Sequence, residues 1–237
     1  FTVGGACLRR YGIKAILKAL GVTMACSMGF MKTLTERLYT SISPMPPTKK
    51  QLQEEDIDAH PLFRCVPALK GKIAWRQLGI FPTPIHKCTV STGGSSTSFF
   101  VKREDLSSTL YGGNKVRTLQ HQLASVEAAM EAGKANRFIV VGSGGSNQCV
   151  ATLFHGEKYG IKADVQYLLR DVPDLDNTLN FLSCASLGGR QNTWEKPVTM
   201  MKTLLSSLLL SGGRSKVAPL GGNQVCGVLG QIGAALE

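Results

Sequence analysis

Short apolar runs alternate with longer helical segments from Phe81 onward, and this alternation constrains the fold more than any other feature of the chain. A run of four to seven apolar residues suits a buried strand, whereas apolar residues three and four apart suit one face of a helix. Strands and helices that alternate in this way form a parallel sheet covered by helices, so we expect an α/β fold. The predicted strands are 99–102, 138–141, 163–169 and 216–220, and the predicted helices are 115–132, 146–159, 177–187, 197–210 and 227–236.

The first 50 residues differ in composition from the rest. The 237-residue chain has a formal net charge of +11, and eight Lys or Arg residues stand against one acid in residues 1–50. Residues 11–31 lack acids and show helical apolar spacing, which is typical either of an organelle transit peptide or of a surface helix. We predict a basic leader or N-terminal extension over 1–50 and a linker with an acidic segment over 51–74.

Composition and spacing argue against several classes of protein. The seven cysteines are dispersed without a CxxC pair and no histidine lies near them at ligand spacing, so we expect reduced cysteines and no metal. No stretch reaches the roughly 18–20 apolar residues that a membrane span needs. Because most of the positive charge lies in residues 1–50, we expect no nucleic-acid partner. The expected location is cytoplasmic or organellar, with mitochondrion and plastid both compatible with the basic leader.

Three glycine-rich turns carry the candidate chemistry. Residues 142–147 and 221–223 each join a predicted strand to a helix, where free backbone N–H groups favour an electron-rich ligand atom. A tight strand-to-helix turn would need the same glycines, and 142–147 lacks the GxGxxG spacing, so both interpretations stay open. The third turn, 111–115, places Lys115 at the first turn of a helix, where the dipole disfavours a protonated amine. Such an amine suits a Schiff base, although an exposed lysine without a role is the common alternative.

Four motifs in order carry a family resemblance. They are Phe81-Pro-Thr-Pro-Ile, Val101-Lys-Arg-Glu-Asp-Leu, Gly112-Gly-Asn-Lys-Val-Arg-Thr-Leu and Ser146-Asn-Gln. Together they resemble the pyridoxal-phosphate-dependent enzymes that comprise 1-aminocyclopropane-1-carboxylate deaminase and D-cysteine desulfhydrase. The similarity extends over residues 75–237. It implies a three-layer parallel-sheet fold of the tryptophan-synthase-β-like type, and we expect 75–237 to form a partial enzyme domain with an incomplete second domain.

The resemblance also implies roles for individual residues. Lys115 would form the Schiff base with pyridoxal phosphate and would later move the substrate proton. Asn147 would donate a hydrogen bond to the phenolic oxygen of the cofactor, and Gln148 would lie beside its ring. Ser146 would contact the substrate carboxylate or act as a base, and Asn114 would position the cofactor. The implied reaction is a lyase or deaminase reaction of a small amino acid, which releases ammonia and a 2-oxo acid.

The motifs leave the substrate and the activity of the chain open. Ser146-Asn-Gln is similar to the deaminase side of the family, whereas the stretch from Gly221 to Gly230 is similar to the desulfhydrase side. The resemblance places the loop that binds the cofactor phosphate after Glu237, so we expect this chain to lack it. The alternative function is therefore an inactive family member that acts as a binding or interaction protein. A homodimer is compatible with either function.

Overall fold

The computed structural model describes residues 29, 32–33, 36–37, 40–169, 174–188 and 190–237. Two compact units make up the chain, Phe1–Leu38 and Tyr39–Glu237. The described residues of the first unit are helical. Of the basic leader or N-terminal extension predicted over 1–50, the structure describes residues 29, 32–33, 36–37 and 40–50, and residues 40–50 belong to the second unit. No described helix is long and apolar enough to cross a membrane.

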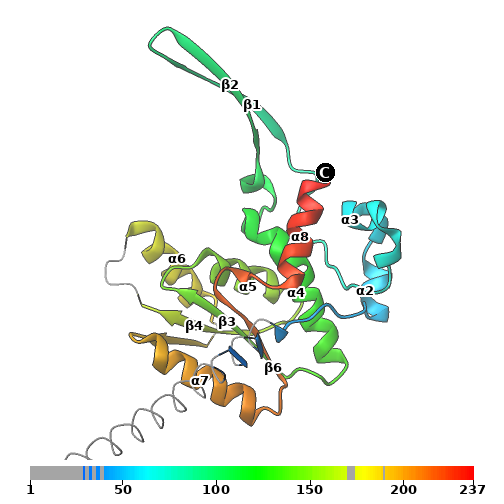
Figure 1. Ribbon diagram of the computed structural model, residues 1–237, viewed down its shortest axis with the longest axis vertical. Helices are drawn as coiled ribbons and strands as arrows, with labels where there is room; N and C mark the ends of the chain where they lie inside the picture. Colours follow the sequence, from blue (N-terminus) through cyan, green and yellow to red (C-terminus); the bar gives the residue numbers. More distant parts are fainter. Residues whose placement is uncertain (1–28, 30–31, 34–35, 38–39, 170–173, 189) are drawn as a thin grey trace, which may run out of the picture. The chain divides into compact units, whose positions relative to one another are not determined.

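Four parallel strands form the central sheet of the second unit, in the order β5-β4-β3-β6 (Figure 1). They are β3 (Arg137–Ser143), β4 (Ala163–Leu168), β5 (Gln191–Trp194) and β6 (Ser215–Ala218). The register aligns Phe138 with Ala163 of β4 and with Lys216 of β6. From β3 the chain moves outward to β4 and β5, and it then returns as β6 on the opposite side of β3. The strands predicted near 138–141, 163–169 and 216–220 are confirmed.

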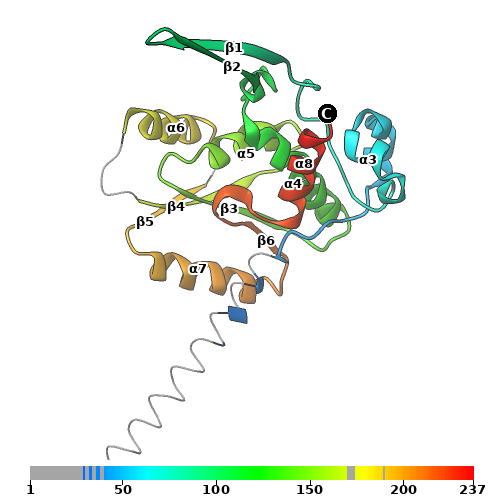
Figure 2. The same cartoon turned by 45° about the horizontal axis from the view of Figure 1, so that its top comes forward.

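Helices cover both faces of this sheet and make the three layers expected (Figure 2). One face carries α4 (Asn114–Glu131), α5 (Asn147–Glu157), α6 (Leu175–Ser186) and α8 (Val225–Ala235), and the other carries α7 (Pro197–Leu210). Each of the five predicted helices is present within a few residues of its predicted bounds. The core lies between β3, β4 and the inner faces of α4 and α5, where Leu119, Val140 and Val150 have no exposed surface.

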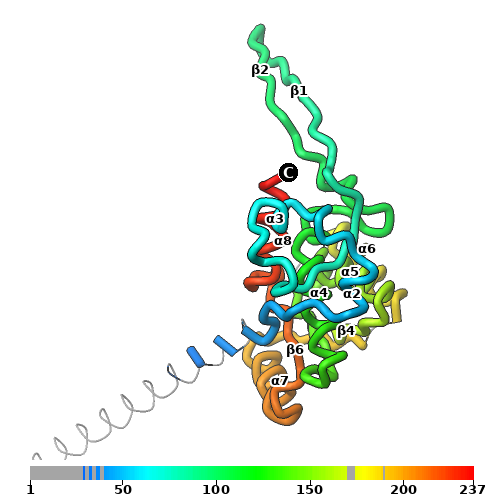
Figure 3. The backbone as a smooth tube through the Cα atoms, turned by 90° about the vertical axis from the view of Figure 1, so that its right-hand side faces the viewer, coloured from blue at the N-terminus to red at the C-terminus, as the bar shows by residue number. Residues whose placement is uncertain are grey.

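A β-hairpin projects from the second unit (Figures 1 and 3). Its strands β1 (Ile85–Thr92) and β2 (Ser95–Lys102) are antiparallel, and Gly93 and Gly94 make the two-residue turn with positive φ angles of 58° and 86°. The strand predicted at 99–102 therefore exists, but its assignment to the parallel βα series is wrong. Strands joined by two residues can pair only in antiparallel fashion, and two β-prone runs around Gly-Gly are the sequence signal for this hairpin.

The segment expected as a linker is folded. It contains α2 (Lys49–Glu54), α3 (Pro61–Cys65) and the short 3₁₀ turns η1 (Ile57–Ala59) and η2 (Pro67–Leu69). Thr48 and Gln51 form a capping box at the start of α2, which satisfies backbone donors that the first turn leaves free. Leu62 and Phe63 are buried. This segment therefore folds into short helices with buried side chains, whereas its prolines and acidic residues had predicted a linker without secondary structure.

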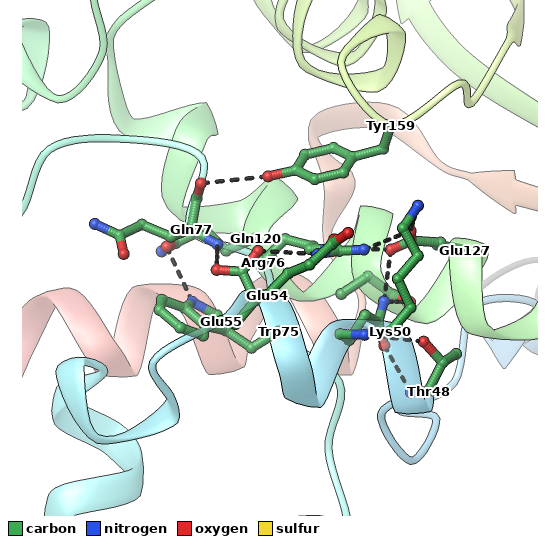
Figure 4. A network of polar contacts seen from close by, with 12 residues as sticks. Thr48, Lys50, Glu54, Glu55, Trp75, Arg76, Gln77, Gln120, Glu127 and Tyr159 are labelled. Carbon is green, nitrogen blue, oxygen red and sulfur yellow. Dashed lines mark hydrogen bonds and ion pairs between the residues drawn. The ribbon is translucent and has the colours of Figure 1, made fainter.

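The acidic residues of this segment surround a buried arginine (Figure 4). The Arg76 guanidinium, whose side chain is 1% exposed, donates to Glu127 at 2.7 and 2.8 Å and to Glu54 at 2.6 Å. Glu55 accepts from the same group at 3.1 Å, and the Tyr159 ring lies 4.7 Å from the guanidinium. Burial disfavours the charge, but these hydrogen bonds outweigh it and raise the Arg76 pKa. The network joins residues 54 and 55 to Glu127 of α4.

We expect Glu127→Gln to lower the free energy of unfolding by about 3 kcal/mol, because it leaves the Arg76 charge buried with fewer partners. The matched control is Asp58→Asn, which removes an acid from the surface pair with Lys70, whose side chains are 71% and 40% exposed. That change should cost less than about 1 kcal/mol. Urea unfolding of both variants measures the difference, and equal losses would contradict the assignment of Arg76 as a structural anchor.

Candidate active site

Strand order reverses between the neighbouring strands β3 and β6, because β4 and β5 lie on one side of β3 and β6 lies on the other. Ligands of open α/β sheets bind outside the carboxyl ends of the strands at such a reversal, and we call this region of the molecule the crevice. The turn after β3 leads into α5, and the turn after β6 contains η4 (Leu220–Gly222). Because α4 immediately precedes β3 and packs against the sheet layer, its first residues lie at the same end. Two of the three glycine-rich turns, 144–146 and 220–223, therefore face the start of α4.

Lys115 lies at this end of the sheet, in the first turn of α4. Its Nζ donates to the carbonyl of Gly221 at 3.2 Å, which joins the start of α4 to the turn after β6. The side chain is half-buried, and no carboxylate among the described residues pairs with it. Burial lowers the Lys115 pKa. This direction agrees with the prediction of an amine that is less readily protonated. The cause is loss of solvent, whereas the prediction had named the helix dipole.

Glycine is required where η4 meets the helices. Gly222 has a φ of +70°, and a Cβ there would lie 2.9 Å from Cγ2 of Thr118 and 3.1 Å from Oε1 of Gln148. Its carbonyl accepts from Nε2 of Gln122 at 2.8 Å. Neighbouring Gly221 also has a positive φ, but a Cβ there would meet nothing within 4 Å. Gly222 is therefore the residue that packs the turn onto α4 and α5, and Gly221 keeps the surface beside Lys115 free of side chains.

Asn147 and Ser146 begin α5, but they have different surroundings. The Asn147 side chain is exposed, and its Oδ1 accepts from the Tyr111 hydroxyl at 2.8 Å and from Nδ2 of Asn180 at 2.7 Å. Ser146 is the N-cap residue, although its side chain makes no capping hydrogen bond. Its side chain and the buried Cys149 both lie beside Gly142, and burial raises the pKa of the Cys149 thiol. The structure thus brings Asn147 into a polar cluster and places Ser146 against the buried face of the turn.

Gln148 is buried, whereas Asn114 is exposed beside Lys115. Gln148 is 1% exposed and contacts Gln122 at 3.4 Å, beneath the turn at Gly222. The resemblance had implied a place beside the cofactor ring, whereas the structure gives Gln148 a supporting contact to the turn. Asn114 is exposed, and its backbone carbonyl accepts from Nε2 of Gln231 in α8 at 2.9 Å.

Three of the four motifs meet in a buried cluster around Arg117. The Arg117 guanidinium donates to Glu104 at 2.9 and 3.0 Å and lies 3.7 Å from the centre of the Phe81 ring. Thr83 donates to Glu104 at 2.7 Å. Burial alone would raise the Glu104 pKa, but its hydrogen bonds to Arg117 and Thr83 lower it. These motif residues are therefore structural, and they hold the loop and helix that carry Lys115.

Other candidate chemistry is lacking in the described part of the chain. It contains no cluster of His, Cys, Asp or Glu that could hold a metal ion. All five cysteines that the structure describes are free, and Cys149, Cys184 and Cys226 are buried. Two cavities of about 420 and 430 Å³ lie elsewhere, one beside Tyr159 and the other beside Arg190. The described residues therefore leave the crevice at Lys115 as the place where a reactive amine and polar side chains meet.

Comparison with known proteins identifies what the chain is similar to. No family model matches the chain. A curated protein of Pyrococcus furiosus named "Putative 1-aminocyclopropane-1-carboxylate deaminase" is 29% identical over 177 residues, which make up 73% of this chain and 51% of that protein. The resemblance inferred from the motifs is confirmed. The chain spans about half the length of this curated relative.

Two solved structures match the chain, and the first of them confirms the fold. One described as an ACC deaminase homologue matches with a TM-score of 0.55 and 24% identity, covering 73% of this chain and 51% of that one. A hydrogen sulfide-producing enzyme from Fusobacterium nucleatum matches with a TM-score of 0.40 and 14% identity, covering 60% and 43%. The first match confirms the α/β fold of the tryptophan-synthase-β-like type that the resemblance implied.

We expect Gly222→Ala to destabilise the protein more than Gly212→Ala. Both residues have positive φ, so both changes introduce backbone strain of about 1 kcal/mol. Only at 222 would the new Cβ also crowd Thr118 and Gln148, which adds about 1–3 kcal/mol, whereas a Cβ at 212 would meet nothing within 4 Å. Urea unfolding of the two variants gives the comparison. Equal destabilisation would show that the turn after β6 does not pack as described.

Proposed function

We propose that this chain belongs to a pyridoxal-phosphate-dependent lyase or deaminase of a small amino acid, of the 1-aminocyclopropane-1-carboxylate deaminase or D-cysteine desulfhydrase type. The observation that carries the proposal is the half-buried Lys115 amine at the reversal of strand order, with a lowered pKa and a backbone carbonyl as its partner. An amine that is uncharged more readily than an ordinary lysine suits covalent binding of an aldehyde. The relationship to a protein named as a deaminase supports the same reaction class.

The residues at the crevice fit this cofactor. Lys115 would hold it covalently, and Asn147 would donate to its phenolic oxygen from the first turn of α5. Gly113, with a φ of +112°, and Gly221 present no side chain, so a planar ring can approach the backbone beside the amine. Asn114 is the motif residue between Gly113 and Lys115, and we assign it a positioning role. When bound, the cofactor supplies an electron sink for the bonding electrons released at the substrate α-carbon.

The chain itself contributes orientation and proton transfer in this proposal. Lys115 Nζ would be the atom that accepts and returns a proton, because burial lowers its pKa and so makes the uncharged amine more accessible than in an ordinary lysine. The Ser146 hydroxyl lies at the N-terminus of α5, where the helix dipole favours a negatively charged group such as a substrate carboxylate. The hydrogen bonds around Arg117 fix the start of α4, and so they keep the Lys115 amine at the crevice.

Lys115 should be the residue that carries the cofactor. After incubation with pyridoxal phosphate and reduction with borohydride, mass spectrometry of peptides is expected to show the added mass on Lys115. The Lys115→Ala variant should lose this adduct and the accompanying absorbance band. Lys162→Ala, which removes an exposed lysine away from the crevice, should retain both. Equal labelling of many surface lysines, unchanged by Lys115→Ala, would contradict the proposal.

Turnover distinguishes the proposed enzyme from the alternative of an interaction protein. The chain with pyridoxal phosphate is expected to release ammonia and a 2-oxo acid from 1-aminocyclopropane-1-carboxylate or D-cysteine, and Lys115→Ala should abolish this release. A coupled assay for ammonia, with sulfide measured for D-cysteine, separates the two substrates. A specific Lys115 adduct without turnover of either substrate would instead favour the non-catalytic function. The exposed hairpin face at Phe100, which is 72% exposed, is the observation in favour of that function.

A further inference from the structure

Tyr111, Asn147 and Asn180 form a polar cluster at the start of α5, and neither sequence motifs nor the resemblance gave Tyr111 or Asn180 a role. The Tyr111 hydroxyl lies 2.8 Å from Oδ1 of Asn147 and 3.1 Å from Oδ1 of Asn180. Nδ2 of Asn180 donates to Oδ1 of Asn147 at 2.7 Å and to the carbonyl of Gly145 at 3.1 Å. The three side chains come from the loop before α4, from α5 and from α6.

Hydrogen-bond chemistry fixes the orientation of both amides. The Gly145 carbonyl can only accept, so the Asn180 atom that faces it must be the NH₂ group. The same NH₂ group faces Asn147, so the Asn147 atom there must be Oδ1. Turning either amide by 180° would place two donors or two acceptors against each other. The NH₂ group of Asn147 is therefore directed away from Asn180, and no acceptor among the described residues binds it.

The two partners of Asn147 are themselves held in place. The Tyr111 ring stacks on Phe154 with centroids 5.7 Å apart and an interplanar angle of 12°, and its backbone carbonyl accepts from Nε2 of His155 at 3.0 Å. Burial raises the Tyr111 pKa, which keeps the phenol protonated as a donor. A Cβ at Gly145 would lie 2.2 Å from the Asn177 carbonyl, so only glycine lets α6 approach closely enough for Asn180 to reach the turn.

We infer that Tyr111 and Asn180 are positioning residues that hold the Asn147 amide with its NH₂ group free to donate to an oxyanion of the bound ligand. This inference rests on the proposed function, in which that oxygen is the phenolic oxygen of pyridoxal phosphate. Two donors on Oδ1 fix the rotation of the amide before the ligand arrives. Pre-oriented donors of this kind cost no rearrangement on binding. The additional site residues are thus Tyr111 and Asn180, which act through Asn147.

The test compares Tyr111→Phe and Asn180→Ala with the control Asn177→Ala. Asn177 lies on the same helix as Asn180, but the partner of its side-chain amide is Asp174, at 2.6 Å. The first measurement uses ¹⁵N-labelled chain without cofactor, and the side-chain amide resonances of Asn147 are assigned by their loss in Asn147→Asp. Tyr111→Phe and Asn180→Ala should shift these resonances, because each variant removes a hydrogen-bond donor to Oδ1 of Asn147. Asn177→Ala should leave the resonances in place.

The second measurement titrates each variant with pyridoxal phosphate. Tyr111→Phe and Asn180→Ala should weaken binding about tenfold and move the absorbance band to shorter wavelength, with Lys115 still labelled after reduction. Asn147 resonances that do not move in these variants would overturn the inference whatever the cofactor does. If Tyr111→Phe and Asn180→Ala bind pyridoxal phosphate as tightly as the unaltered chain, the inference is overturned and the proposed function still stands. An unaltered chain that binds no pyridoxal phosphate would overturn the proposed function and, with it, this inference.

Discussion

The buried ion pair between Arg117 and Glu104 holds the part of the molecule on which the candidate site depends. Arg117 is two residues beyond Lys115, and its side chain is 2% exposed. A buried charge of this kind is costly unless its hydrogen bonds are satisfied, and here Glu104 and Glu237 both accept from it. Removal of either carboxylate would leave the buried charge with one counter-ion in place of two. The pair therefore restricts where the first turn of α4 can lie, and with it the reactive amine.

A second buried arginine restricts the position of the other end of α4. Arg76 binds Glu127 near the end of that helix and Glu54 at the end of α2. The two arginines together anchor α4 at both ends to segments that precede it in the chain. Between them the helix packs closely against α8, where a Cβ at Gly230 would lie 1.9 Å from the Arg117 carbonyl. Helix α4 is thus fixed by charge at its ends and by backbone contact along its length.

Regular hydrophobic patterning accounts for the parts of the fold that were predictable from sequence. Strand β3 is an apolar run buried on both faces, and α4 has apolar residues at helical spacing, so each has a signal of its own. Strand β5 consists of three polar residues and Trp194 at the sheet edge, and it forms because β4 offers it hydrogen bonds. The helices of residues 49–65 were likewise missed, because their stability comes from packing and from the Arg76 network. The place of Lys115 in the first turn of a helix was predictable from the sequence, because the helix after Gly113 has a clear apolar pattern. Asn180 was not, because it lies 33 residues beyond Asn147 and only the packing of α6 on the turn at Gly145 brings them together.

In the proposed function, the residues that would hold the cofactor are separate from any residues that would select the substrate. Lys115, Asn147 and their supports are held by contacts inside the second unit, from Arg117 on one side and from Tyr111 and Asn180 on the other. The backbone of Gly221 accepts from Lys115, and this residue carries no side chain to distinguish one small amino acid from another. Specificity requires side chains that meet the substrate, since it arises from differences in contact free energy between competing ligands. In the proposed function, the described residues around Lys115 would hold a cofactor common to the reaction class, and the mixed deaminase-like and desulfhydrase-like motifs of this chain are compatible with the same arrangement.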